Sequence, residues 1–205
     1  MRVILIRHLP TPGNEKRQYI GRTDEALSLA AVEKFQRQHG AGGKGTAYPP
    51  VDWIIASPLK RCVQTAKLIW PGQEIRTEPM LRECDFGQYE RKTYEELKNE
   101  PEYIEWMESG GMTAFPGGEE QTEFRARCAA GAEKWIGQLL EKRADSVAFV
   151  IHGGTIMAVL EQLAEGPREF YRWQAENGGG YIAEADREEW LSGRYVLRNI
   201  HRLIP

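Results

Sequence analysis

The feature that most constrains the fold is a short apolar run near the amino terminus that stops abruptly at a charged pair. Residues 3–6 read Val-Ile-Leu-Ile, with β-branched side chains at three of the four positions, which is typical of a buried central strand. Arg7 and His8 follow directly, and the prolines and glycine within 10–13 then predict a loop. Open α/β sheets bind ligands at the carboxyl ends of such strands, so Arg7 and His8 are candidate site residues.

Length and composition limit the class of protein. The chain has 205 residues and a net charge of −3, which predicts one globular domain spanning residues 1–205. It has no Lys/Arg-rich tract, so we expect neither a nucleic-acid partner nor binding to a membrane surface. We also expect no signal peptide and no transmembrane span, because the apolar run before Arg7 is too short for either.

The three cysteines indicate a reducing compartment. Cys62, Cys84 and Cys128 are widely spaced, odd in number and without a CxxC pair. This spacing favours free thiols in a cytoplasmic protein over a disulfide framework. We interpret Cys62 and Cys84 as small packing residues, not as nucleophiles.

A second apolar run precedes a helix that carries another cation. Residues 51–56 predict a buried strand. Ser57 is the expected helix cap, and Pro58 then occupies the first helical position. The helix is expected over 59–70, which puts Arg61 in its first turn.

A third apolar run, at 146–151, ends at His152 and precedes an apolar helix that extends to Leu163. Residues 81–118 break into short helices and loops rich in aromatic residues, which we interpret as an insertion over one face of the sheet. Its aromatic side chains either pack the insertion or, for one or two of them, face the substrate. A helix is predicted at 28–39, with Ser28 as its cap and Leu29, Val32 and Phe35 on its apolar face. The remaining patterns predict an edge strand at 74–77, a helix at 119–143, and strands at 180–183 and 195–197.

A glycine-rich segment at 39–46 superficially suggests a phosphate-binding P-loop. The first glycine of that pattern would fall on Gln38, and Lys44 is followed by glycine instead of Ser or Thr. No strand precedes the segment either. We therefore interpret it as a surface linker, and His39 and His201 as surface residues outside any motif.

Two of the strands end in histidine, and parallel pairing would bring His8 and His152 to the same sheet edge. Arg61 lies at that edge as well. Two histidines and the guanidinium groups of Arg7 and Arg61 describe a pocket for a phosphate dianion, because guanidinium groups match phosphate oxygens in geometry and charge.

Such a pocket can support group transfer as well as binding. A neutral imidazole at His8 is nucleophilic, and neighbouring arginines favour its neutral form. The leaving oxygen then needs a proton donor, for which Glu83 and Asp85 are the candidates. A metal site built from His8, His152 and Glu83 lacks HxxH or HExxH spacing, so we expect no metal.

Five segments together resemble the histidine phosphatase superfamily, the phosphoglycerate-mutase-like proteins, in its branch of small phosphatases. They are LIRHLPTPGN (5–14), ASPLKRCVQTA (56–66), LRECDFGQYE (81–90), PGGEE (116–120) and VIHGGT (150–155). Each segment alone is a weak signal. All five occur in the family's order and span most of the chain.

The resemblance implies a three-layer α/β/α sandwich on a mostly parallel sheet, with a cap inserted at about 83–118. It makes His8 the phosphorylated nucleophile and favours Glu83 over Asp85 as the proton donor, and it implies no cofactor. The residues that it places at the substrate phosphate are Arg7, Asn14, Thr23, Arg61, His152 and Thr155, with Thr23 and Thr155 as second-tier contacts.

One position departs from the family pattern. The family's usual Arg-His-Gly is Arg-His-Leu here, with Leu9 followed by Pro10. If this backbone requires a positive φ, leucine costs about 1–2 kcal/mol. Pro10 also removes an N–H that could bind the anion.

Function is expected to be phosphomonoester hydrolysis through a phosphohistidine, with a small-molecule substrate. The stretches 85–90 and 116–119 are similar to α-ribazole phosphatases of cobalamin synthesis, and also to broad-specificity sugar-phosphate and nucleotide phosphatases. A phosphoglycerate mutase and a catalytically inactive binding module are the alternatives. The sequence at 85–91 is more similar to the phosphatases' FGxWEG than to the mutases' YGxLxG. The oligomeric state stays open.

Overall fold

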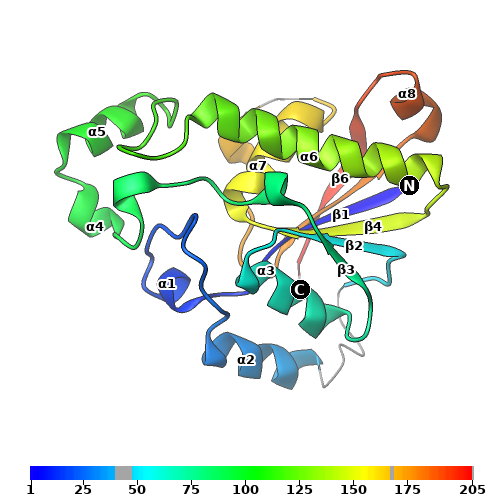
Figure 1. Cartoon of the computed structure of the whole chain (residues 1–205), viewed down its shortest axis with the longest axis horizontal. Coiled ribbons are helices and arrows are strands. Elements are labelled where there is room, and N and C mark those ends of the chain that lie inside the picture. Colours follow the sequence, from blue (N-terminus) through cyan, green and yellow to red (C-terminus); the bar gives the residue numbers. More distant parts are fainter. Residues whose placement is uncertain (40–47, 167–168, 205) are drawn as a thin grey trace.

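The computed structural model describes residues 1–39, 48–166 and 169–204. Within them, six strands form one sheet in the order β3-β2-β4-β1-β5-β6 (Figure 1). The four strands from β3 to β1 pair in parallel, whereas β5 and β6 are antiparallel additions at one edge. The strands are β1 (Arg2–Arg7), β2 (Trp53–Ala56), β3 (Ile75–Thr77), β4 (Ser146–Ile151), β5 (Gly180–Ala185) and β6 (Leu197–Leu203).

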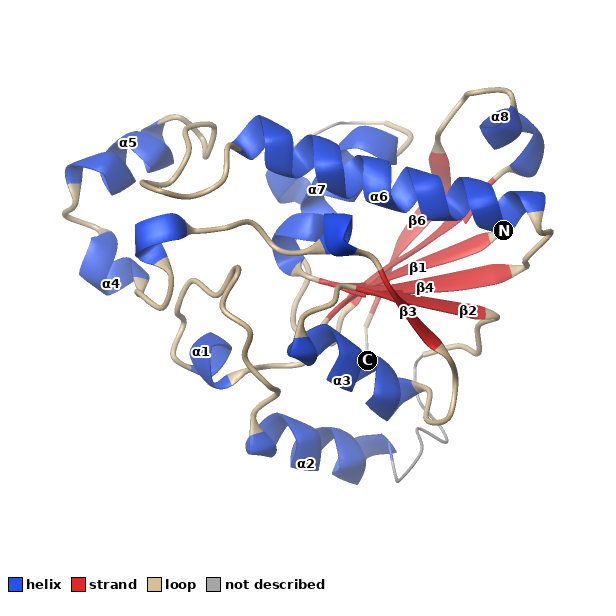
Figure 2. Ribbon diagram, viewed as in Figure 1, coloured by secondary structure: helices blue, strands red, loops and turns tan. Residues whose placement is uncertain are grey.

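Helices cover both faces of this sheet. Figures 1 and 2 show α6 (Gln121–Glu141) and α7 (Gly153–Leu163) over one face, and α2 (Leu29–His39) and α3 (Lys60–Ile69) over the other. The expected three-layer α/β/α sandwich is confirmed. The shorter elements are α1 (Pro12–Glu15), α4 (Tyr94–Leu97), α5 (Pro101–Glu108), α8 (Arg187–Leu191) and the 3₁₀ turns η1 (Pro79–Leu81), η2 (Gly87–Tyr89) and η3 (Phe170–Trp173).

The apolar run in β1 reflects burial on both of its faces. Val3 and Leu5 pack into the hydrophobic cluster under α6 and α7. Ile4 and Ile6 point the opposite way, into the cluster under α2 and α3. Because successive strand side chains alternate between faces, a strand covered on both sides has to be apolar at every position.

Three expectations about local structure are wrong. Helix α3 starts at Lys60 with Leu59 as its N-cap residue, so Ser57 is not the helix cap. Leu29, expected on the apolar face of α2, is 82% exposed, because α2 turns Ala31 and Phe35 toward the core. The last strand is not at 195–197 but begins at Leu197. As an edge strand it pairs with β5 alone, and only its first and last residues are buried, which gives a weak apolar signal.

The cap segment, residues 83–118, contains η2, α4 and α5 and lies beyond the carboxyl ends of the parallel strands (Figure 2). It has a small hydrophobic cluster of its own, formed by Tyr89, Leu97, Tyr103 and Phe115. These aromatics therefore pack the cap. The linker expected at 39–46 lies outside the described residues apart from His39.

None of the helices in the described ranges is long and apolar enough to cross a membrane.

The β1–β5 pairing depends on a glycine. Gly180 pairs with Ile6, and a Cβ at position 180 would overlap the carbonyl oxygen of Leu5. We expect Gly180→Ala to destabilise the fold by about 1–3 kcal/mol, because the clash is with backbone. Urea unfolding should show a lower midpoint.

Gly137→Ala is the matched control. Its added Cβ would lie 3.5 Å from Nε1 of Trp190, an ordinary contact, and Ala is favoured over Gly inside a helix by about 1 kcal/mol. An unchanged midpoint for Gly180→Ala would contradict the close approach of β5 to β1.

Candidate active site

The two histidines meet where β1 and β4 end. The backbone N–H of His8 donates to the carbonyl of Ile151 at 2.9 Å, which continues the β1–β4 pairing past the strand. The imidazole centroids of His8 and His152 are 5.2 Å apart, with the rings inclined at 68°. Both side chains are buried. The convergence expected from parallel pairing is therefore present.

The backbone carbonyl of Leu9, the residue that departs from the family pattern, sets the orientation of the His8 imidazole. Nδ1 of His8 lies 2.7 Å from the carbonyl oxygen of Leu9. A carbonyl only accepts hydrogen bonds, so Nδ1 carries the proton and Nε2 keeps its lone pair. Burial, reinforced by the positive charge of Arg61, holds the pKa of His8 well below 6.5. His8 is thus a neutral imidazole with Nε2 as its basic nitrogen.

Leucine at position 9 causes no left-handed strain. Among the described residues, the non-glycine positions with positive φ are Arg17, Arg91, Arg143 and Asn199. Leu9 is buried in the cluster under α2 and α3, and its N–H donates to Oγ1 of Thr65 at 3.0 Å. Its backbone therefore anchors the loop and, through its carbonyl, the nucleophile candidate.

Arg61 and His152 form a buried unit behind His8. Arg61 Nε donates to Nδ1 of His152 at 3.2 Å. With Nδ1 accepting, the proton of a neutral His152 lies on Nε2, which is 2.8 Å from Oγ of Ser57. Burial and the charge of Arg61 keep the pKa of His152 well below 6.5. Ser57, expected to cap a helix, instead fixes this imidazole.

The rest of the Arg61 guanidinium bonds to a loop. Its terminal nitrogens donate to the carbonyl oxygens of Thr23 at 2.7 Å and Gly21 at 2.8 Å. The carboxylate of Glu90 holds the same loop by accepting from the N–H groups of Gly21, Arg22 and Thr23. The cap segment, through Glu90, therefore fixes the loop that surrounds Arg61.

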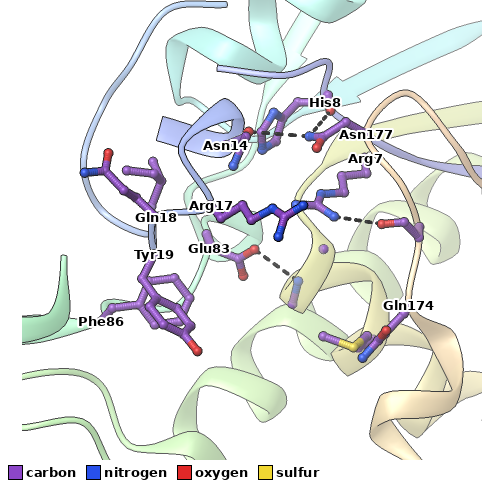
Figure 3. Close-up of a pocket in the computed structure, with 15 residues that line it drawn as sticks. Arg7, His8, Asn14, Arg17, Gln18, Tyr19, Glu83, Phe86, Gln174 and Asn177 are labelled. Atoms are coloured by element: carbon purple, nitrogen blue, oxygen red, sulfur yellow. Dashed lines mark hydrogen bonds between the residues drawn. The ribbon is translucent and has the colours of Figure 1, made fainter. Parts of the chain in front are cut away.

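In front of His8 lies an open cavity of about 500 Å³. Arg7 lines it and donates from one terminal nitrogen to the carbonyl of Ala175 at 2.8 Å. Among the described residues, the buried Nε of Arg7 has no hydrogen-bond partner. Asn14 also lines the cavity; its Oδ1 accepts from the N–H of Thr11, which leaves the amide nitrogen as a donor (Figure 3).

Glu83 faces the same cavity from the opposite side (Figure 3). Its carboxylate accepts from the N–H of Gly154 at 3.0 Å and of Cys84 at 3.1 Å. Burial raises the pKa of Glu83 above 4.5 despite these hydrogen bonds and the charges of Arg61 and Arg7. The carboxyl can therefore hold a proton more readily than an exposed glutamate. Asp85, its rival, forms an ion pair with Arg22 instead.

The expected site residues fall into three groups. Arg7, His8, Asn14 and Glu83 line the cavity, whereas Arg61 and His152 lie behind His8. Thr23 donates its hydroxyl to Glu90 at 2.6 Å, and the buried Thr155 hydroxyl lies 3.4 Å from the carbonyl of Arg82. The assignment of these side chains to substrate contact stays a prediction.

Several cavity residues are absent from the sequence-based prediction. Asn177 donates from its side-chain amide to the carbonyl of His8 at 2.9 Å, and Arg17 extends across the cavity (Figure 3). Phe86 and Met157 add apolar surface. The glycines after Asn177 were a usable signal for a tight loop near the site. No local pattern distinguishes Arg17 from the exposed cations around it.

A family comparison decides the classification. The model of the histidine phosphatase superfamily (branch 1) matches residues 3–197. The chain belongs to the histidine phosphatase superfamily.

The similar proteins carry names that refer to different activities. The chain is 27% identical to Probable phosphoglycerate mutase GpmB of Yersinia enterocolitica, over 97% of this chain and 92% of that protein. It is also 27% identical to Broad-specificity phosphatase YOR283W of Saccharomyces cerevisiae, over 80% of this chain and 70% of that protein. The crystal structure of the α-ribazole phosphatase from Shigella flexneri has a TM-score of 0.74 and 24% identity, with 91% of each chain covered, and shares the fold.

The cysteines of this histidine phosphatase are expected to be unreactive in the native state. All three are free and buried, and burial raises the pKa of the thiols of Cys62 and Cys128 and brings that of Cys84 to about 12. Since the thiolate is the reactive form, iodoacetamide at pH 8 should leave the folded chain unmodified. Mass spectrometry should find three modified cysteines after unfolding in urea. Rapid modification of Cys62 or Cys84 in the folded chain would contradict their packing role.

Proposed function

We propose that this chain hydrolyses phosphomonoesters through a phosphohistidine at His8. The observation that carries the proposal is the hydrogen bond from Nδ1 of His8 to the Leu9 carbonyl, which leaves Nε2 as the nucleophilic nitrogen. Arg7 lines the same cavity, where its guanidinium can bind a phosphate oxygen. Membership of the superfamily supports the same chemistry.

The proposed reaction has two steps. In the first, Nε2 of His8 attacks phosphorus, the bond from phosphorus to the ester oxygen breaks, and protonated Glu83 gives its proton to that oxygen. In the second, the Glu83 carboxylate takes a proton from water as the water oxygen attacks phosphorus. The phosphorus–nitrogen bond then breaks, and inorganic phosphate and neutral His8 are released. Both steps use side chains and water alone.

The remaining predicted residues support the phosphoryl group in this proposal. Asn14 donates its side-chain amide, and the amino terminus of α7 adds backbone N–H groups at Gly153. Arg61 contributes positive potential from behind His8, and the neutral His152, held by Arg61 and Ser57, helps to position the site. We further propose that residues 1–205 form one domain whose cap segment covers the substrate, and that the three reduced thiols reflect a cytoplasmic location.

The substrate is proposed to be a small phosphomonoester, with an α-ribazole phosphate as the first candidate and sugar phosphates or nucleotides as the alternatives. Phe86 and Met157 offer apolar surface to the alcohol part of such a substrate. The shared fold with the Shigella flexneri enzyme supports testing that candidate first. Purified protein should be screened against a panel of phosphometabolites.

A phosphoglycerate mutase is the second candidate, because the Yersinia enterocolitica relative carries that name. The stretch at 85–91 is more similar to the phosphatase pattern. A 2,3-bisphosphoglycerate-dependent isomerisation assay separates the two activities. Robust turnover in that assay would reverse the ranking.

The pH dependence of kcat/KM tests the proposed roles of Glu83 as proton donor and His8 as neutral nucleophile together. Protonated Glu83 is needed in the first step, so kcat/KM for an alkyl phosphate should fall as pH rises through its raised pKa. Lowering the pH through 6.5 should not protonate His8, because the pKa of His8 lies well below that value. His8→Ala should be inactive at every pH.

The Glu83→Gln variant, compared with the parent protein on alkyl and aryl phosphates, tests the role of Glu83 alone. Removing general acid catalysis is expected to lower kcat/KM for an alkyl phosphate by about 10²–10⁴-fold. The loss should be much smaller for an aryl phosphate, whose phenolate leaves without a proton. The substrate itself ionises at about pH 6, which affects the parent and Glu83→Gln equally. The difference between their pH profiles of kcat/KM therefore isolates the ionisation of Glu83. Full activity in His8→Ala would refute the mechanism.

A further inference from the structure

Arg17 has an unusual backbone conformation at the edge of the cavity. It follows α1, and its φ is +58°, a left-handed conformation that residues with a Cβ adopt rarely. Its N–H donates to the carbonyl of Asn14 at 3.0 Å, so the turn is tied to a predicted phosphate-binding residue. Figure 3 shows the Arg17 side chain extending across the cavity, with its guanidinium end directed toward that of Arg7.

The Arg17 side chain has no counter-ion in the described part of the chain. No hydrogen bond or ion pair of its guanidinium occurs among those residues, and the cavity carboxylate, Glu83, accepts from two backbone N–H groups instead. Arg7 lines the same cavity. Two cations that face one cavity repel each other, and an anion between them removes that repulsion.

Arg61, the cation expected from the sequence, is already occupied. Its guanidinium has no exposed surface and donates to His152 and to the carbonyls of Gly21 and Thr23. It therefore uses most of its five N–H donors on acceptors within the protein. A phosphoryl group in transfer carries charge on three equatorial oxygens, and Arg7 and Arg17 are the two arginines that line the cavity.

We propose that Arg17 is a phosphate-binding residue whose guanidinium contacts the transferred phosphoryl group from the side opposite Arg7. The inference rests on the proposed function and deepens it. Arg17 adds a second arginine to the lining of the cavity, beside Arg7. Its ligand is the phosphate dianion of the substrate and of the product.

The test uses three variants of the full chain. Arg17→Gly removes the cation and also relieves the left-handed backbone, so this variant should unfold in urea at the parent's midpoint or above it. Arg17→Lys keeps the charge but not the forked donor set. Lys16→Gln is the matched control, because Lys16 is the exposed neighbour at the end of α1 and does not line the cavity.

Two quantities are measured for each variant: the inhibition constant of inorganic phosphate and kcat/KM for an aryl phosphate. Loss of a charged hydrogen-bonding group is expected to weaken phosphate inhibition and to lower kcat/KM by about 10- to 100-fold in Arg17→Gly. Arg17→Lys should recover part of both quantities. Lys16→Gln should stay within about twofold of the parent, since it removes only an exposed charge.

Two results would overturn the inference. One is unchanged phosphate inhibition and kcat/KM in Arg17→Gly. The other is a loss confined to substrates with a second acidic group, with phosphate inhibition unchanged, because Arg17 would then bind that group and not the transferred phosphoryl. Neither result touches the proposed reaction, which fails separately if His8→Ala remains active.

Discussion

The site depends on the buried guanidinium of Arg61. A charge without exposed surface is costly unless hydrogen bonds replace its hydration, and here carbonyl oxygens of Gly21 and Thr23, together with Nδ1 of His152, accept from it. These bonds join helix α3, the loop at 20–23 and the end of β4. Glu90 extends the network into the cap segment. The same interactions that satisfy one buried cation thus hold together the segments around His8.

The two arginines expected from the sequence have different positions and different effects. Arg61 lies behind the imidazoles and, with burial, lowers the pKa of both His8 and His152. Arg7 lines the cavity, and its buried Nε has no hydrogen-bond partner within the described part of the chain. On the opposite wall, burial raises the pKa of Glu83. A neutral nucleophile and a carboxyl able to hold a proton are what phosphoryl transfer to histidine requires, and one cavity brings them together.

The sequence predicted the parts of the fold that depend on local pattern. The strands at 3–6 and 146–151 were found because burial on both faces makes every position apolar. Strand β6 was displaced in the prediction because an edge strand buries only part of its surface. The partners of Arg61 could not be predicted, since they are backbone carbonyls brought close by the loop at 20–23. Arg17 was missed because its direction depends on a positive φ that the sequence does not reveal.

The central claim is that His8 is the group that becomes phosphorylated. The most direct measurement is to mix the protein with an aryl phosphate, quench within milliseconds in alkali, digest, and locate the phosphate by mass spectrometry. The account predicts phosphate on the peptide that contains His8, stable in alkali and lost in acid. Turnover without phosphate on His8, or with phosphate on another residue, would contradict it.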